Sequence, residues 1–224
     1  MKAVLCRQFG EPLSFEEVTP PPLEAGQVRI KVAACGINFP DTLIVQGKYQ
    51  FKPELPFSPG CEVAGEIMDI APDVSGFAVG DPVIAAGLWG GFAEQMVAKA
   101  RQVMHRPASM DAVTAAAFAT TYGTSYHALK QRAALQPGET LLVLGAAGGV
   151  GLAAVELGRE MGGTVIAAAS SEEKLALARQ YGAVETIDYS QGSLKDQIKA
   201  LTGGRGADVI YDPVGGDLGE EAVR

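Results

Sequence analysis

The stretch that decides the fold is Thr140-Leu141-Leu142-Val143-Leu144-Gly145-Ala146-Ala147-Gly148-Gly149-Val150-Gly151. Its apolar start is typical of a strand that is buried on both faces of a parallel sheet. Gly148 and Gly151, with Ala146 in the place of a first glycine, follow the spacing of the loop that joins such a strand to a helix and holds a dinucleotide. The pattern predicts a strand, a phosphate-binding turn and a helix, in that order.

Each residue of this turn has an expected task. Gly148 has no side chain to keep a pyrophosphate away from the backbone, and the amides of Gly149 and Val150 would point at it from the helix N-terminus. Ala147 is also expected to contact the cofactor. The alternative is a tight turn whose glycines serve only the packing of the helix against the strand. We therefore expect dinucleotide binding at 147–150, with the packing turn as the competing interpretation.

The rest of the C-terminal half repeats the alternation of strand and helix. Short apolar runs that predict buried strands recur after the first one, at 164–169, 183–187 and 207–211. A helical segment is expected over 111–131, and Leu194, Ile198 and Leu201 mark a later helix. This order is typical of a doubly wound parallel sheet, here assigned to residues 116–224. The fold class is therefore α/β.

The first 115 residues follow a different pattern. Four runs bounded by Gly and Pro have the period of two that predicts antiparallel strands, at 27–33, 63–70, 80–86 and 92–97. A short helix is expected near 41–46, with Pro40 in its first turn and Gly47 at its end. Residues 1–115 are therefore expected to form a small β domain.

Composition excludes several classes of function. There are 18 basic and 26 acidic residues, a formal net charge of −8, and this balance does not suit nucleic acid or anionic membranes. No apolar run reaches the roughly 18 residues of a transmembrane helix, and the N-terminus does not resemble a secretory signal. Three separated cysteines, Cys6, Cys35 and Cys61, indicate a reducing compartment, and we expect a cytoplasmic protein without membrane insertion.

The end of the second predicted strand indicates which nucleotide fits. Sites for NAD usually carry an acidic residue about 20 residues after the glycine loop, where it binds the ribose 2′-hydroxyl. This chain has Ala169-Ser170-Ser171 there, followed by Lys174. A cation without a carboxylate favours the 2′-phosphate of NADPH. The alternative is a capping box between Ser170 and Glu173, with Lys174 a solvated surface residue.

Two further motifs, Cys35-Gly36-Ile37-Asn38-Phe39-Pro40-Asp41 and Ser58-Pro59-Gly60-Cys61-Glu62-Val63-Ala64-Gly65, precede the nucleotide-binding pattern. With it they resemble the medium-chain dehydrogenase/reductase superfamily, and within it the zinc-free NADPH:quinone oxidoreductases. The resemblance implies a GroES-like domain followed by a Rossmann domain. Gly60 is followed by Cys-Glu rather than the His-Glu of the zinc-dependent branch, and His105 and His127 lie outside the motifs, so no metal site is expected.

The resemblance also implies site residues. Asn38 and Tyr49 match positions that line the nicotinamide and substrate site, although Asn38 also suits a helix N-cap and Tyr49 a loop aromatic that covers core. Thr124 matches a threonine near the nicotinamide. Further residues match the 2′-phosphate site and the loop after the fourth strand: Ser170, Ser171, Lys174, Tyr189 and Val214.

The activity that this resemblance implies is hydride transfer from NADPH to a small-molecule quinone or α,β-unsaturated carbonyl. The Tyr49 hydroxyl or the Asn38 amide would meet the developing oxyanion. One alternative is the reduction of enoyl thioesters or acrylates on the same scaffold. Another is an NADPH-binding protein with impaired catalysis, because members of the family continue for roughly a hundred more residues and close the sheet with further strands. An open fourth strand would then favour a homodimer.

Overall fold

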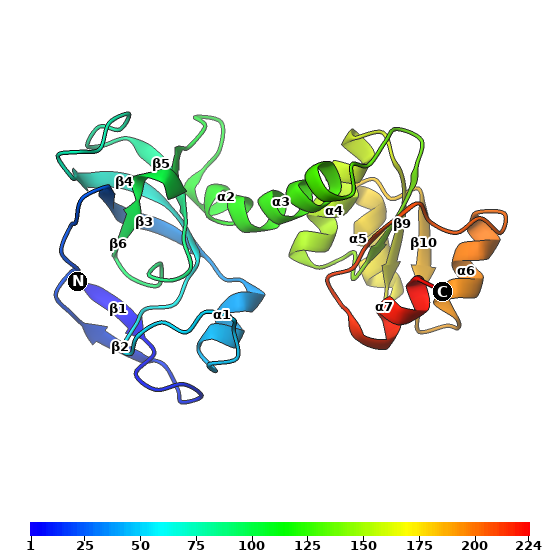
Figure 1. Ribbon diagram of the computed structural model, residues 1–224, viewed down its shortest axis with the longest axis horizontal. Helices are drawn as coiled ribbons and strands as arrows, with labels where there is room; N and C mark the ends of the chain where they lie inside the picture. The colour runs from blue at the N-terminus through cyan, green and yellow to red at the C-terminus, as the bar shows by residue number, and fades with distance from the viewer. The chain divides into compact units, whose positions relative to one another are not determined.

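The computed structural model describes all 224 residues, which divide into two compact units, Met1–Thr120 and Thr121–Arg224 (Figure 1). The first unit is built on antiparallel strands and the second on a parallel sheet with helices between its strands. The expected α/β class, with a β domain followed by a doubly wound domain, is confirmed. No helix combines the length and the apolar character that crossing a membrane requires.

The first unit contains a five-stranded antiparallel sheet in the order β6-β3-β4-β5-β7. Alternate residues of its strands point into one core, which includes Val28, Ile30, Val63 and Ile67. This period of two is what the sequence predicted for these runs. The strands are β3 (Gln27–Gly36), β4 (Glu62–Ile70), β5 (Pro82–Ala86), β6 (Gln95–Lys99) and β7 (Val103–His105), and a 3₁₀ turn, η1 (Ala100–Gln102), joins the last two.

The helix α1 (Phe39–Ile44) connects β3 to β4 and begins two residues before the expected start. Its N-cap is Asn38, and the Asp41 carboxylate accepts a hydrogen bond from the Asn38 backbone N–H at 2.8 Å. Gly47 has a φ of +66°, which a glycine adopts without strain just after a helix. Pro40 therefore lies in the first turn of the helix and Gly47 follows its end, as predicted, although the helix ends at Ile44 and not at 46.

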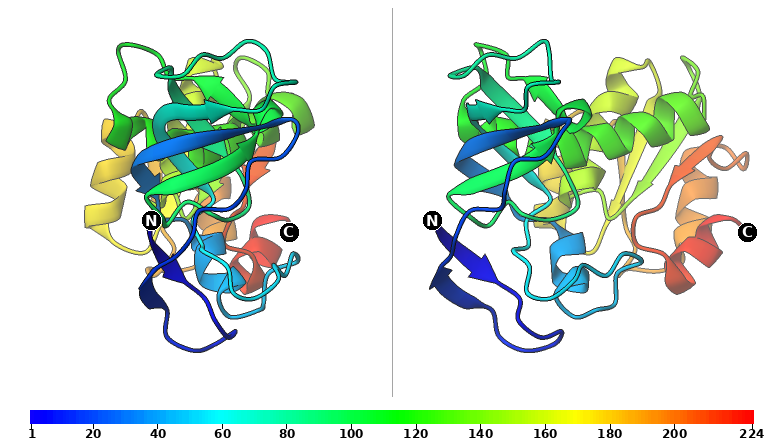
Figure 2. Two further views of the ribbon diagram at one scale, coloured as in Figure 1. Left: turned by 90° about the vertical axis from the view of Figure 1, so that its left-hand side faces the viewer. Right: turned by 60° about the vertical axis from the view of Figure 1, so that its left-hand side comes forward.

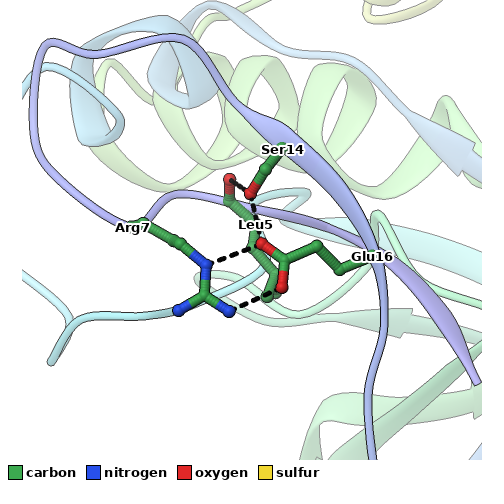
Figure 3. Close-up of polar contacts among 4 residues, drawn as sticks. All are labelled: Leu5, Arg7, Ser14 and Glu16. Carbon is green, nitrogen blue, oxygen red and sulfur yellow. Dashed lines mark hydrogen bonds and ion pairs between the residues drawn. The ribbon is translucent and has the colours of Figure 1, made fainter.

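A separate two-stranded ribbon, dark blue in Figure 2, is formed by β1 (Lys2–Leu5) and β2 (Ser14–Glu17). Figure 3 shows its main polar contact. Arg7 donates two hydrogen bonds to the Glu16 carboxylate, Nε to Oε1 at 2.6 Å and Nη2 to Oε2 at 2.5 Å, and the Ser14 hydroxyl donates to Oε1 at 2.6 Å. The bonds from Arg7 and then Ser14 lower the pKa of Glu16 to about 2. This pairing holds the segment that follows β1 against β2.

The second unit has a four-stranded parallel sheet in the order β10-β9-β8-β11. In chain order this is 3-2-1-4, the order expected of the first four strands of a doubly wound fold. The strands are β8 (Thr140–Leu144), β9 (Thr164–Ala169), β10 (Glu185–Asp188) and β11 (Val209–Tyr211). The strand β8, which leads to the glycine turn, therefore lies inside the sheet, and β11 forms one edge.

Helices cover both faces of this sheet. Leu141 and Val143 of β8 pack on one face with residues of α4 and α5, while Leu142 and Leu144 pack on the other face with Leu194 of α6. Both faces are buried, which explains the unbroken apolar runs of the strands. The helices are α4 (Gly149–Glu160), α5 (Glu172–Gln180), α6 (Leu194–Leu201) and α7 (Gly216–Ala222).

The segment expected as one helix over 111–131 is divided into three. It forms α2 (Ala112–Ala116), α3 (Phe118–Tyr126) and a π-helical turn, η2 (His127–Arg132). Asp111 caps α2 by accepting the Thr114 N–H at 2.8 Å, but Ala117, with φ −107° and ψ 2°, interrupts the helix. The expectation of a continuous helix was wrong, because the Ala117 N–H bonds to the Thr114 carbonyl at 3.2 Å and the backbone leaves the helical conformation there.

The start of α4 lies directly against the glycine turn. A Cβ on Gly151 would come within 2.3 Å of the Gly145 carbonyl oxygen, so only glycine fits there. At Gly148 the nearest atom to such a Cβ is the same oxygen at 3.4 Å, an ordinary contact. Packing within the protein therefore requires glycine at 151 and does not require it at 148.

These two glycines should respond differently to the same substitution. Gly151→Ala should lower the free energy of unfolding of the second unit by about 1–3 kcal/mol, because the added methyl group overpacks backbone. Gly148→Ala is the matched control and should change it by less than about 1 kcal/mol, since φ there is −77° and the space is open. Denaturant titrations followed by amide resonances of β8 and α4 measure both. If both variants lose the same free energy of unfolding, packing does not require glycine at 151 more than at 148.

The Glu16 carboxyl of the ribbon should have a pKa below the ordinary range of a glutamate. The Arg7–Glu16 contribution is present above pH 4.5, the ordinary value for Glu16, and is lost as the pH falls toward about 2. An NMR titration of the Glu16 side chain should show this low pKa, and Arg7→Gln should raise it toward the ordinary value. If the pKa of Glu16 is the same in Arg7→Gln as in the wild type, the ion pair does not lower it.

Candidate functional site

A cavity of about 680 Å³ opens beside the glycine turn in the second unit. Four residues that the sequence singled out line it, Ala147, Gly148, Lys174 and Tyr189. The remaining wall is formed by Gly145, Ala169, Glu173, Ala176, Leu177 and Gln180. The volume lies within the roughly 300–1,000 Å³ that small-molecule sites occupy. Residues from the turn, from the end of β9 and from α5 thus meet around one space.

The helix N-terminus supplies donors at the turn. Gly148 is the N-cap of α4, and the N–H groups of Gly149 and Val150 have no hydrogen-bond partner within the chain. Unpaired N–H groups and the positive end of the helix dipole attract an anion. The turn can therefore bind a phosphate with backbone atoms alone.

The polar residues after β9 include the expected cation. Lys174 Nζ donates a hydrogen bond to Ser170 Oγ at 2.9 Å, so the ammonium and this hydroxyl lie side by side. Ser171 is the N-cap of α5, and its Oγ accepts the Lys174 backbone N–H at 3.5 Å. The alternative of a capping box between Ser170 and Glu173 is therefore wrong, because the helix begins one residue later than that pattern requires.

Sequence reasoning missed the carboxylate in this wall. Glu173 lines the cavity from the first turn of α5, while no acidic residue stands at the end of β9, where Ala169 is buried. The neighbouring Glu172 is held by Arg179 in an ion pair of 2.6 Å. The signal for Glu173 was its place one residue before Lys174 in the sequence, which alone does not indicate which face of the helix it occupies.

Tyr189 and Val214 lie on loops that follow strands. The Tyr189 N–H donates to the Ala169 carbonyl at 3.2 Å, which fixes this residue beside the end of β9. The Val214 N–H donates to Asp212 Oδ1 at 2.9 Å. The Val214 side chain lies beside Gly145, because a Cβ added to Gly145 would be 2.8 Å from Val214 Cγ2. Thr124 is exposed on α3, and neither it nor Val214 lines the cavity.

The first unit contains a second polar cluster, at the start of α1. The Asn38 side-chain amide donates to Glu62 Oε1 at 2.8 Å and to Cys61 Sγ at 3.4 Å. Glu62 is fully buried, and its Oε2 accepts the Thr120 backbone N–H at 2.8 Å. Cys61 Sγ lies 3.7 Å from Thr120 Oγ1. Sequence reasoning proposed Asn38 for the site and did not identify Glu62 as its partner.

Burial controls the titration of the neighbouring groups. Asp41 accepts the backbone N–H groups of Asn38 at 2.8 Å and Gly60 at 3.1 Å, yet burial raises the pKa of this carboxyl. Burial also raises the pKa of the Cys61 thiol, and that of Cys35 to about 12. These thiols are therefore protonated and unreactive near neutral pH.

Tyr49 is half-buried and packs against the small core of Cys6, Ile44 and Phe57. Its ring lies 6.3 Å from that of Phe51, tilted by 56°. The hydroxyl has no hydrogen-bond partner within the chain, so it is free to donate to a ligand. Both interpretations of Tyr49 are therefore compatible with its surroundings, since the ring packs and the hydroxyl does not.

The donors in the first unit do not fit a zinc site. No group of three or more His, Cys, Asp or Glu side chains is placed to hold a metal ion. Asn38 occupies one side of Cys61, and both oxygens of Glu62 accept N–H hydrogen bonds. A catalytic zinc needs three converging protein ligands, and these residues do not supply them.

Comparisons with known proteins identify the family. Residues 24–108 match the family model "Alcohol dehydrogenase GroES-like domain", and residues 149–224 match "Zinc-binding dehydrogenase". Quinone oxidoreductase-like protein 2 homolog of Nematostella vectensis is 44% identical over 225 residues, which cover 100% of this chain and 62% of the relative. The crystal structure of Escherichia coli quinone oxidoreductase complexed with NADPH has a TM-score of 0.94 and 30% identity, over 100% of this chain and 69% of that one.

The chain belongs to the quinone oxidoreductase family. This family is part of the medium-chain dehydrogenase/reductase superfamily, as the motifs indicated. The CurK enoyl reductase is also similar, with a TM-score of 0.91 and 28% identity over 99% of this chain and 70% of that one. The chain spans less than two thirds of the length of the Nematostella quinone oxidoreductase-like protein.

The three thiols provide a test of the first unit. Since burial raises the pKa of Cys6, Cys35 and Cys61, none should react with iodoacetamide at pH 7 while the protein is folded. All three should react in denaturant, which serves as the control. Mass spectrometry of the labelled peptides measures the outcome, and rapid labelling of native Cys61 would contradict the described cluster.

Proposed function

We propose that the chain belongs to an enzyme that uses NADPH to reduce quinones or α,β-unsaturated carbonyls without a metal. The observation that carries the proposal is the cavity wall in which Gly148 and Lys174 lie together, with no acidic residue at the end of β9. A helix N-terminus suits a pyrophosphate, and a lysine beside a serine suits a 2′-phosphate. The NADPH complex of the similar E. coli enzyme supports the same cofactor.

The residues present fit this cofactor. Gly148 is not required by packing within the protein, and a Cβ there would stand at the mouth of the turn where a pyrophosphate would approach. Gly149 and Val150 would bind the pyrophosphate through their N–H groups, and Ala147 would form the wall beside it. Ser170, Ser171, Lys174 and Tyr189 would surround the 2′-phosphate, and Val214 and Thr124 would contact the cofactor further along. NADPH, when bound, supplies the hydride for the reduction.

The first unit would supply the groups that meet the substrate. The Tyr49 hydroxyl has no partner in the chain and can donate a hydrogen bond to the oxygen on which negative charge develops. Tyr49 or water would then deliver the proton. Asn38 was expected to share this task, but both hydrogens of its amide are donated to Glu62 and Cys61. We therefore assign the donor role to Tyr49 and leave Asn38 as a site residue.

One alternative is the reduction of an enoyl thioester, which the similarity to the CurK enoyl reductase favours. A second is NADPH binding without turnover by the 224-residue chain. NADPH oxidation measured with a panel of quinones, enones and enoyl thioesters separates the three. Turnover with quinones or enones supports the proposal, turnover with thioesters alone supports the first alternative, and binding without turnover supports the second. A homodimer stays a prediction, based on the edge position of β11.

Lys174→Ala should weaken NADPH binding much more than NADH binding. A hydrogen bond to a charged group contributes roughly 1.5–3 kcal/mol, so the affinity for NADPH should fall about 10- to 100-fold. The loss should be smaller at high salt, because the lysine is exposed.

Lys199→Ala removes an exposed lysine from α6, outside the cavity, and is the matched control. Isothermal titration with both cofactors measures the effect. Wild-type protein that binds NADPH and NADH equally would show that Ser170 and Lys174 do not select the 2′-phosphate.

A further inference from the structure

Glu62 is a buried carboxylate whose two oxygens are both engaged. It lies at the start of β4 and accepts N–H groups from Asn38 before α1 and from Thr120 in the first turn of α3. Gly36 of β3 makes room for it, because a Cβ there would lie 2.6 Å from Glu62 Oε1 and 2.4 Å from the Ala116 carbonyl oxygen. Four segments of the first unit thus meet around one side chain.

This arrangement determines the orientation of the Asn38 amide. A carboxylate oxygen only accepts hydrogen bonds, so the Asn38 NH₂ group and not its oxygen must face Glu62. The second hydrogen of that NH₂ points to Cys61 Sγ at 3.4 Å. The Asn38 oxygen faces the backbone N–H of Asp41 at the helix start, in a capping-box arrangement. A carbonyl oxygen accepts two hydrogen bonds, so capacity remains for a ligand.

We propose that Glu62 is a positioning residue that makes Asn38 a hydrogen-bond acceptor toward the ligand. The ligand group that it meets must carry a hydrogen, such as the hydroxyl of a reduced quinone. This inference rests on the proposed function for the identity of the ligand. The orientation of Asn38 itself rests only on the contacts of the first unit.

An exchange of the amide and the carboxylate tests the proposal. In Glu62→Gln, the new oxygen must accept the Thr120 N–H, so the new NH₂ faces Asn38 and forces its amide to turn around. In Asn38→Asp, two carboxylates face each other. In the double variant, the introduced aspartate accepts from the introduced glutamine with one oxygen and keeps an acceptor at the position of the original Asn38 oxygen. The double variant also has the net charge of the wild type.

Side-chain NMR reports the orientation of the Asn38 amide and does not require an active enzyme. In ¹⁵N-labelled wild-type protein, the Asn38 NH₂ signals, assigned by their loss in Asn38→Asp, should exchange slowly with water. In Glu62→Gln they should move and exchange at least about tenfold faster. Glu66→Gln, an exposed position on the same strand, is the matched control and should leave them unchanged. Unchanged Asn38 signals in Glu62→Gln would overturn the positioning role, whatever the activity of the chain.

Steady-state kinetics test whether Asn38 acts as an acceptor. Each single variant should lower kcat/KM for NADPH-dependent reduction about 10- to 100-fold, with an unchanged affinity of the second unit for 2′,5′-ADP. The double variant should recover most of this loss. If the double variant has the melting temperature of the wild type but a kcat/KM as low as that of Asn38→Asp, then Asn38 acts as a donor and the acceptor role is overturned. A wild type without turnover would refute the proposed function and, with it, the ligand assignment, while the NMR result would still decide the orientation.

Discussion

The contact between Gly151 and the Gly145 carbonyl oxygen is the constraint on which the second unit depends. Any side chain at 151 would collide with this backbone, so α4 can begin directly against the end of β8. That approach places the unpaired N–H groups of Gly149 and Val150 at the carboxyl end of an interior strand. Ligands of open α/β sheets bind at this end, and the 680 Å³ cavity lies there.

The first unit depends on two buried carboxylates in a similar way. Asp41 holds the start of α1 to Gly60, and Glu62 holds Asn38 to the first turn of α3. A buried carboxylate is costly unless its oxygens are paired, so these groups impose defined positions on the N–H groups around them. Asn38, Asp41, Gly60, Glu62 and Thr120 therefore form a hydrogen-bond network that fixes the start of α1.

Several features could be predicted from the sequence because they follow from local periodicity. The apolar run at 140–144 predicted an interior strand, and the structure has β8 there. The interruption at Ala117 could not be predicted, because alanine is the residue with the highest intrinsic helix propensity. The partners of Glu62 could not be predicted either, because its contacts span 24 and 58 residues. Its motif indicated the absence of a histidine and gave no sign of what the carboxylate binds.

We propose that the glycine turn and the Ser170–Lys174 segment together bind one NADPH molecule. The most direct measurement is a backbone amide NMR titration of the ¹⁵N-labelled chain with NADPH. Saturable shifts are expected at Gly148–Val150, at Ser170–Lys174 and at Tyr189, with one dissociation constant for all of them. Shifts confined to other residues, or a second constant for the Ser170–Lys174 segment, would contradict it.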